Sequence, residues 1–135
     1  MQPTYLIVEN EMIYDAIIIG GGPSGATAAM ELALQNRKVA FIDREGRIKP
    51  CGGAVPPRLI RDFNIPDSQI VAKIKTARMI SPTSRMVDIP IENGYVGMVE
   101  RENFDEFLRN RACNKGAKRF TGTFLRVKRI AENDI

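Results

Sequence analysis

Histidine is absent from all 135 residues, and cysteine occurs only twice. Without an imidazole the chain cannot form Ser-His-Asp or Cys-His catalytic groups or a histidine metal site. Cys51 and Cys113 are too few for a disulfide framework, and their spacing is not that of metal ligands. We therefore expect no metal in this chain and a reducing, cytoplasmic setting.

Long apolar runs are also missing: none approaches the roughly 18 to 20 residues that span a bilayer. Residues 1–11 lack the basic start and apolar core of a signal peptide, and we expect them to be a loosely held N-terminal extension. The 20 basic and 16 acidic residues give a net charge of +4, spread along the chain. Because no basic stretch is interleaved with aromatic residues, nucleic-acid binding is not predicted. The basic residues are expected to cover a solvated surface or to meet phosphate groups.

A glycine-rich turn follows the first predicted strand. Residues 16–19 are apolar and mostly β-branched, and they lead directly into Gly20, Gly22 and Gly25, which match the pattern G-x-G-x-x-G. In this pattern the first glycine allows a tight turn, the second leaves room for a pyrophosphate, and the third lets the helix lie close to the strand. The residues after Ser24 are predicted to be helical as far as Leu34, with free N–H groups facing the phosphates.

A second strand, residues 38–43, ends in an acidic side chain. Asp43 lies 18 positions after Gly25, near the roughly 20 expected for a carboxylate that accepts hydrogen bonds from an adenosine ribose. A glycine triplet alone would be weak support, but strand, glycines, helix, strand and acid in this order indicate a dinucleotide site. The alternative is a glycine-rich turn in an unrelated α/β domain.

The long segment 44–57 is rich in charge, glycine and proline, and long ordered loops are usually functional. Within it, Cys51 is followed by Gly52 and Gly53, which allow the backbone to approach a flat ligand closely. A thiol at this place could contact a reactive ring. An ordinary turn with a buried thiol is an equally good interpretation of these residues.

Farther along, the pattern changes to antiparallel strands. Residues 77–81 and 86–89 flank a turn and predict a hairpin, which cannot belong to a parallel sheet. We expect an α/β fold: a Rossmann-like βαβ start with an inserted antiparallel hairpin and sheet, residues 70–100 facing a substrate. A strand at 95–99, a helix ending at Gly116, a third parallel strand at 117–120 and an outward strand at 123–130 complete the prediction. Because such a sheet needs further strands, we expect an incomplete domain.

Two sets of residues resemble a known family. Residues 14–26 resemble the opening of the FAD-containing hydroxylase and reductase superfamily. The segment 48–57, Ile-Lys-Pro-Cys-Gly-Gly-Ala-Val-Pro-Pro, is more particular. With residues 79–82, 95–99 and 101–105 it resembles the geranylgeranyl reductases of chlorophyll and bacteriochlorophyll synthesis. The resemblance covers residues 12–135, which we interpret as the N-terminal part of an FAD-binding domain.

The resemblance implies a flavoprotein that uses NADPH to saturate double bonds of a geranylgeranyl chain, carried by a pigment or a diphosphate, to give a phytyl chain. It also implies that the Cys51 element lies along the flavin ring. Because the chain has no histidine, our hypothesis is that Cys51 is the catalytic proton donor, with water or a residue outside this chain as alternatives. An isoprenoid substrate also implies peripheral contact with the photosynthetic membrane. The family's second flavin motif is not in this chain, so the chain alone is expected to be inactive. The residues assigned to the FAD site are Gly20, Gly22, Ser24, Gly25, Asp43, Arg44, Cys51, Gly52, Gly53, Ala54, Arg101 and Phe124.

Three alternatives share the same glycine turn. A flavin monooxygenase of the superfamily would hydroxylate a ring, and an archaeal-type reductase would act on isoprenoid membrane lipids. A non-catalytic, truncated nucleotide-binding chain is the third.

Overall fold

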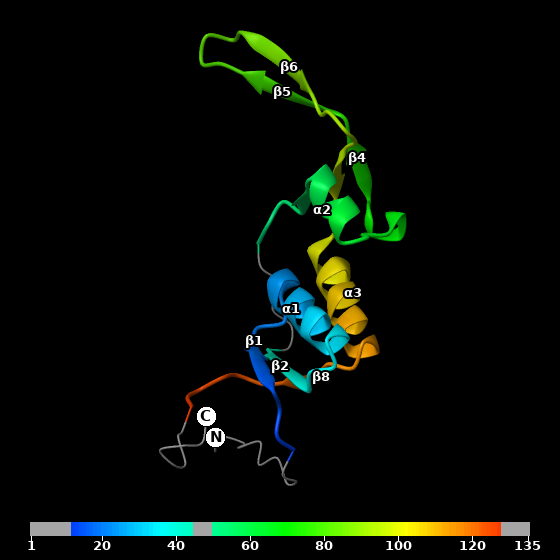
Figure 1. Cartoon of the computed structure of the whole chain (residues 1–135). Helices are drawn as coiled ribbons and strands as arrows, with labels where there is room; N and C mark the ends of the chain where they lie inside the picture. The colour runs from blue at the N-terminus through cyan, green and yellow to red at the C-terminus, as the bar shows by residue number, and fades with distance from the viewer. Residues whose placement is uncertain (1–11, 45–49, 128–135) are drawn as a thin grey trace. The chain divides into compact units, whose positions relative to one another are not determined.

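The computed structural model describes residues 12–44 and 50–127 (Figure 1). The predicted extension at 1–11 lies outside the described residues, as do residues 45–49 of the loop before Cys51 and residues 128–135. The chain divides into two compact units, one formed by Met1–Gly46 with Leu108–Ile135 and the other by Arg47–Phe107.

The first unit is a three-stranded parallel sheet with helices. Its strands run in the order β1-β2-β8, with Ala16 paired to Val39 and Asp43 paired to Thr121. The predicted parallel βαβ start and third parallel strand are therefore confirmed. The elements are β1 (Ala16–Ile19), α1 (Pro23–Leu34), β2 (Val39–Asp43), β8 (Lys118–Thr121) and the second half of α3 (Arg101–Asn114).

The core of this unit lies on the sheet face that carries α1 and the end of α3 (Figure 1). Alanines recur along one side of α1, and their small side chains let the helix approach the strands closely. Phe41 of the central strand is completely buried, whereas Ile17 and Ile19 of the edge strand β1 are 59% and 50% exposed. The buried members of the core are Ala29, Met30, Ala33, Val39, Phe41, Ala112 and Ala117.

The outward strand predicted at 123–130 is wrong for its described part, because residues 123–127 form no strand. Pairing of β8 with β2 stops at Thr121, where β2 itself ends. The N–H of Gly122 then donates to the carbonyl of Asp43 at 2.8 Å. The apolar side chains of this segment are exposed: Leu125 is 74% and Val127 is 80% exposed.

The second unit is antiparallel. One sheet has the order β3-β7-β4, and β5 pairs with β6 as a separate hairpin. The predicted antiparallel insertion is therefore confirmed. The elements are β3 (Ala54–Val55), α2 (Pro57–Asp62), the 3-10 helix η1 (Asp67–Gln69), β4 (Ala72–Ile74), β5 (Thr76–Ile80), β6 (Met86–Pro90), β7 (Val96–Met98) and the first half of α3.

Packing in the second unit depends on a small residue in β7. A Cβ at Gly97 would lie 2.7 Å from Ile70 and 3.0 Å from Ile60, so the missing side chain lets both isoleucines cover the strand. The hairpin is exposed along its length and carries a bidentate pair between Arg78 and Asp88, at 2.6 and 2.8 Å. Both side chains are exposed to solvent, which screens the pair, so it contributes little to stability. None of the helices within residues 12–44 and 50–127 combines the length and the hydropathy of a membrane-spanning segment.

Candidate dinucleotide and thiol sites

The turn after β1 presents main-chain donors at the start of α1. Gly20 has φ +103, a left-handed conformation that suits glycine, and its N–H donates to the carbonyl of Ile42 at 2.8 Å. Gly22 caps the helix without a side-chain hydrogen bond, and the first N–H groups of a helix have no intrahelical partner. A Cβ at Gly22 would meet nothing within 4 Å, so space is open there. Ser24 is exposed beside it. This arrangement fits a pyrophosphate.

Gly25 lies in the first turn of α1, where the helix meets the preceding turn. A Cβ at this position would come within 1.9 Å of the Gly20 carbonyl oxygen and 3.3 Å of Ile18. The absence of a side chain therefore sets the distance between helix and strand, and with it the position of the main-chain donors.

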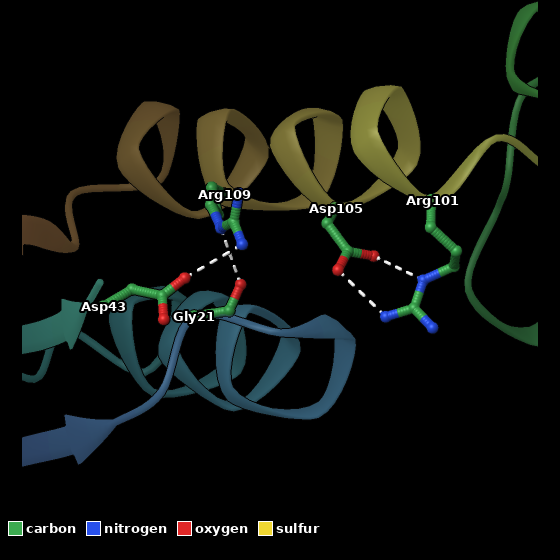
Figure 2. A network of polar contacts seen from close by, with 5 residues as sticks. All are labelled: Gly21, Asp43, Arg101, Asp105 and Arg109. Carbon is green, nitrogen blue, oxygen red and sulfur yellow. Dashed lines mark hydrogen bonds and ion pairs between the residues drawn. The ribbon is translucent and has the colours of Figure 1, made fainter. Parts of the chain in front are cut away.

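Asp43 ends β2 next to the glycine turn and forms an ion pair with Arg109 of α3 (Figure 2). The Arg109 Nη2 lies 2.9 Å from Asp43 Oδ2, and its Nε donates to the carbonyl of Gly21 at 2.7 Å. A Cβ at Gly21 would lie 2.8 Å from Asp43 Oδ2. Sequence reasoning found Asp43 but missed Arg109 and Gly21. The only sequence signal for this contact was an arginine within a predicted amphipathic helix, and such a residue does not indicate which side chain it contacts.

Arg44 and Phe124 follow the carboxyl ends of neighbouring parallel strands. Arg44 is exposed directly after β2, and Phe124, 45% exposed, lies beyond the end of β8. The ends of parallel strands are where open α/β sheets bind ligands. The cofactor contacts of these two residues stay predictions.

The second unit holds the other predicted residues around Cys51. Cys51 and Gly52 are exposed in the loop, Gly53 is buried, and Ala54 begins β3. Gly53 has φ +70, and a Cβ there would come within 2.1 Å of the Val99 carbonyl oxygen, so only glycine fits. The N–H of Val99 donates to the Gly53 carbonyl at 2.9 Å, which ties the loop to the chain before α3.

Arg101 begins α3 and forms a bidentate pair with Asp105, with both nitrogen-oxygen distances 2.9 Å (Figure 2). The two side chains are 14% and 7% exposed. Hydrogen bonding to Asp105 is the main cause that raises the pKa of Arg101, so the guanidinium stays charged. Asp105 was not singled out from the sequence, although its i,i+4 spacing from Arg101 is a local signal.

The surroundings of Cys51 favour the thiolate form of its side chain. Hydrogen bonding holds the pKa of Cys51 below its usual value. The larger effect comes from the Gly53 main chain and the smaller one from the Arg101 side chain. Because the pKa is lowered in the folded protein, thiolate is present at lower pH than for a free thiol. It is lost as the pH falls through the lowered pKa.

We therefore expect Cys51 to be alkylated at lower pH than a model thiol. In a Cys113→Ala background, the midpoint of the pH profile for iodoacetamide alkylation should lie below that of N-acetylcysteine amide. Arg101→Gln should raise the midpoint only partway, because the larger contribution, from the Gly53 main chain, is kept. A midpoint equal to or above that of the model thiol would contradict the geometry of this loop.

The predicted site residues thus form two groups, one in each unit. The glycine turn, Asp43, Arg44 and Phe124 belong to the first unit, and residues 51–54 with Arg101 belong to the second. Among the residues that the structure describes, no group of three or more His, Cys, Asp or Glu side chains could hold a metal ion.

The chain is similar to known oxidoreductases. Residues 14–123 match the family model for pyridine nucleotide-disulphide oxidoreductases. The chain is 67% identical over 118 residues to a geranylgeranyl diphosphate reductase of Rhodobacter capsulatus, a match that covers 87% of this chain and 30% of the relative. It is 41% identical over 114 residues to the chloroplastic geranylgeranyl diphosphate reductase of Arabidopsis thaliana, covering 82% of this chain and 24% of the relative.

Among solved structures, a geranylgeranyl bacteriochlorophyll reductase-like protein from Thermoplasma acidophilum superposes with a TM-score of 0.73 and 28% identity. That match covers 80% of this chain and 30% of the other. The chain therefore spans less than a third of the length of each of these proteins. Because the family model covers most of its residues, the chain belongs to the pyridine nucleotide-disulphide oxidoreductase family.

Proposed function

We propose that this chain is the FAD-binding part of an NADPH-dependent geranylgeranyl reductase, which saturates isoprenoid double bonds to give the phytyl chains of chlorophyll or bacteriochlorophyll. The observation that carries the proposal is the 67% identity over 118 residues to the Rhodobacter capsulatus geranylgeranyl diphosphate reductase. The glycine turn supports the cofactor-binding part of the proposal, because the open space at Gly22 and the close approach of helix and strand at Gly25 suit a pyrophosphate.

The residues of the first unit fit the adenosine and pyrophosphate half of FAD. The N–H groups of Gly22, Ser24 and Gly25 would hold the pyrophosphate at the positive end of α1, and Asp43 would accept hydrogen bonds from the ribose. In the second unit, the Cys51 loop and Arg101 would lie along the flavin. When bound, FAD would supply hydride chemistry between NADPH and an alkene carbon.

Cys51 is the proposed proton donor to the neighbouring alkene carbon. The hydrogen bonds with the Gly53 main chain and with Arg101 lower the pKa of its thiol, which makes it a stronger acid than a free cysteine. Cys51 is an exposed residue, so a substrate could approach it. The charged Arg101 would then stabilise the thiolate until solvent returns the proton.

The test is an assay of the intact protein with NADPH and geranylgeranyl diphosphate in the absence of oxygen. The expected protein is yellow with a flavin spectrum, and the product gains two hydrogens for each double bond reduced while one NADPH is consumed. Cys51→Ala should keep the bound flavin and lower the reduction rate by roughly 10²-fold or more, the range of general acid catalysis.

Each alternative gives a different result in this assay. Oxidation of NADPH that requires oxygen would indicate a monooxygenase, and reduction of a digeranylgeranyl glycerophospholipid but not of geranylgeranyl diphosphate would indicate the lipid reductase. A colourless protein that binds no flavin would refute the proposal. An unchanged rate in Cys51→Ala would remove the thiol from the mechanism and leave the reductase assignment in place.

A further inference from the structure

A single side chain joins three segments of the first unit that are far apart in the sequence. Arg109 of α3 donates from Nε to the carbonyl of Gly21, 88 positions away, at 2.7 Å. Its Nη2 lies 2.9 Å from Oδ2 of Asp43 at the end of β2. The Arg109 and Asp43 side chains are only 12% and 19% exposed, so solvent screens this contact weakly.

The Asp43 carboxylate is packed against the turn backbone. A Cβ at Gly21 would lie 2.8 Å from Asp43 Oδ2 and 2.9 Å from Asp43 Cβ, so any side chain at Gly21 would displace the carboxylate. Arg109 contacts both the negatively charged carboxylate and the neighbouring Gly21 carbonyl, whose oxygen carries a partial negative charge. A planar guanidinium can donate to both at once, which an ammonium group with a single charged centre cannot do in a fixed orientation.

The ion-pair contact drawn in Figure 2 is made through Oδ2, and Oδ1 is the second oxygen of the same carboxylate. We propose that Arg109 is a positioning residue of the dinucleotide site, which holds the Asp43 carboxylate against Gly21 so that Oδ1 accepts a hydrogen bond from an adenosine ribose hydroxyl. This inference rests on the proposed function, because it needs a dinucleotide at the glycine turn. The inference adds Arg109 to the site, as the residue that fixes the orientation of the Asp43 carboxylate.

The readout is discrimination between two nucleotides that differ only at the ribose. ADP and 2′-deoxy-ADP share the base and the pyrophosphate, but only ADP offers the 2′-hydroxyl. A hydrogen bond to a charged group is worth roughly a tenfold to hundredfold change in affinity. The intact protein, freed of flavin, should bind ADP more tightly than 2′-deoxy-ADP by about that factor. In Arg109→Gln the preference should fall to about one.

Asp43→Asn should lose the preference to a similar extent, and the double variant should lose no more than either single variant. Lys115→Gln, an exposed position after α3 that removes the same charge, is the matched control and should keep the preference. If Arg109→Gln does not fold, Arg109→Lys gives the same test, because lysine keeps the positive charge but lacks the planar guanidinium that donates to both oxygens.

The outcomes separate the two proposals. If the unchanged protein binds neither ADP nor FAD, the proposed function fails. The second case is that the unchanged protein prefers ADP, and Arg109→Gln or Arg109→Lys lowers the affinity for both nucleotides equally and keeps the preference. Arg109 then has only a structural role, and the positioning inference is overturned. Binding is followed by calorimetry, so the result does not depend on catalysis.

Discussion

Gly25→Ala is expected to destabilise the first unit by about 3 kcal/mol or more, the upper range for overpacking. The added Cβ would lie 1.9 Å from the Gly20 carbonyl oxygen. That atom belongs to the backbone of the turn and cannot rotate away, and Gly20 is itself fixed by the hydrogen bond from its N–H to Ile42. The only relief is for α1 to move away from β1, which opens the alanine-lined core. The measurement is chemical unfolding of the intact protein.

Gly22→Ala is the matched control on the same turn. Its Cβ would meet nothing within 4 Å and its φ is −70, so it should cost no more than about 1 kcal/mol of stability. It should nevertheless weaken FAD binding, because the new methyl group occupies the space open to the pyrophosphate. Equal unfolding midpoints for Gly25→Ala and the unchanged protein would show that the helix does not depend on this close approach.

The parts of the fold that sequence predicted are those specified by neighbouring residues. Glycines at fixed spacing, a β-branched run and a terminal acid lie within 28 positions, from Ala16 to Asp43. The hairpin of β5 and β6 was predicted for the same reason, since its turn and both strands are contiguous. In each case the pattern reports a local requirement: a left-handed φ, a close approach or a chain reversal.

The contacts that sequence missed join distant segments. Nothing near Arg109 indicates that its guanidinium meets Asp43, 66 positions earlier, because the contact exists only once β2 and α3 are packed in the same unit. The described part of the strand predicted at 123–130, residues 123–127, forms no strand for a related reason. A strand forms only where a partner offers hydrogen bonds, and β2 ends at Asp43.

The buried pair in α3 leads to the second large effect. Asp105→Ala is expected to lower the free energy of unfolding by about 3–5 kcal/mol, because it leaves the Arg101 guanidinium charged, 14% exposed and without its bidentate partner. The pKa of Arg101 is raised chiefly by Asp105, and loss of that contact cannot be relieved by deprotonation near neutral pH. The loss should therefore be nearly independent of pH between about 6 and 9, as followed by chemical unfolding.

Two controls decide whether the uncompensated charge is the cause. Glu102→Gln removes an exposed acidic side chain from the same first turn of α3 and should cost about 0.3–1 kcal/mol. Replacing both partners, Arg101→Met with Asp105→Leu, should recover most of the stability lost in Asp105→Ala, since no buried charge remains. It should also return the Cys51 alkylation midpoint toward that of a free thiol, because the Arg101 contact that lowers the thiol pKa is gone. If the double variant were as unstable as Asp105→Ala, the loss would come from packing around Asp105, and the pair's remaining role would be to keep Arg101 beside the thiol.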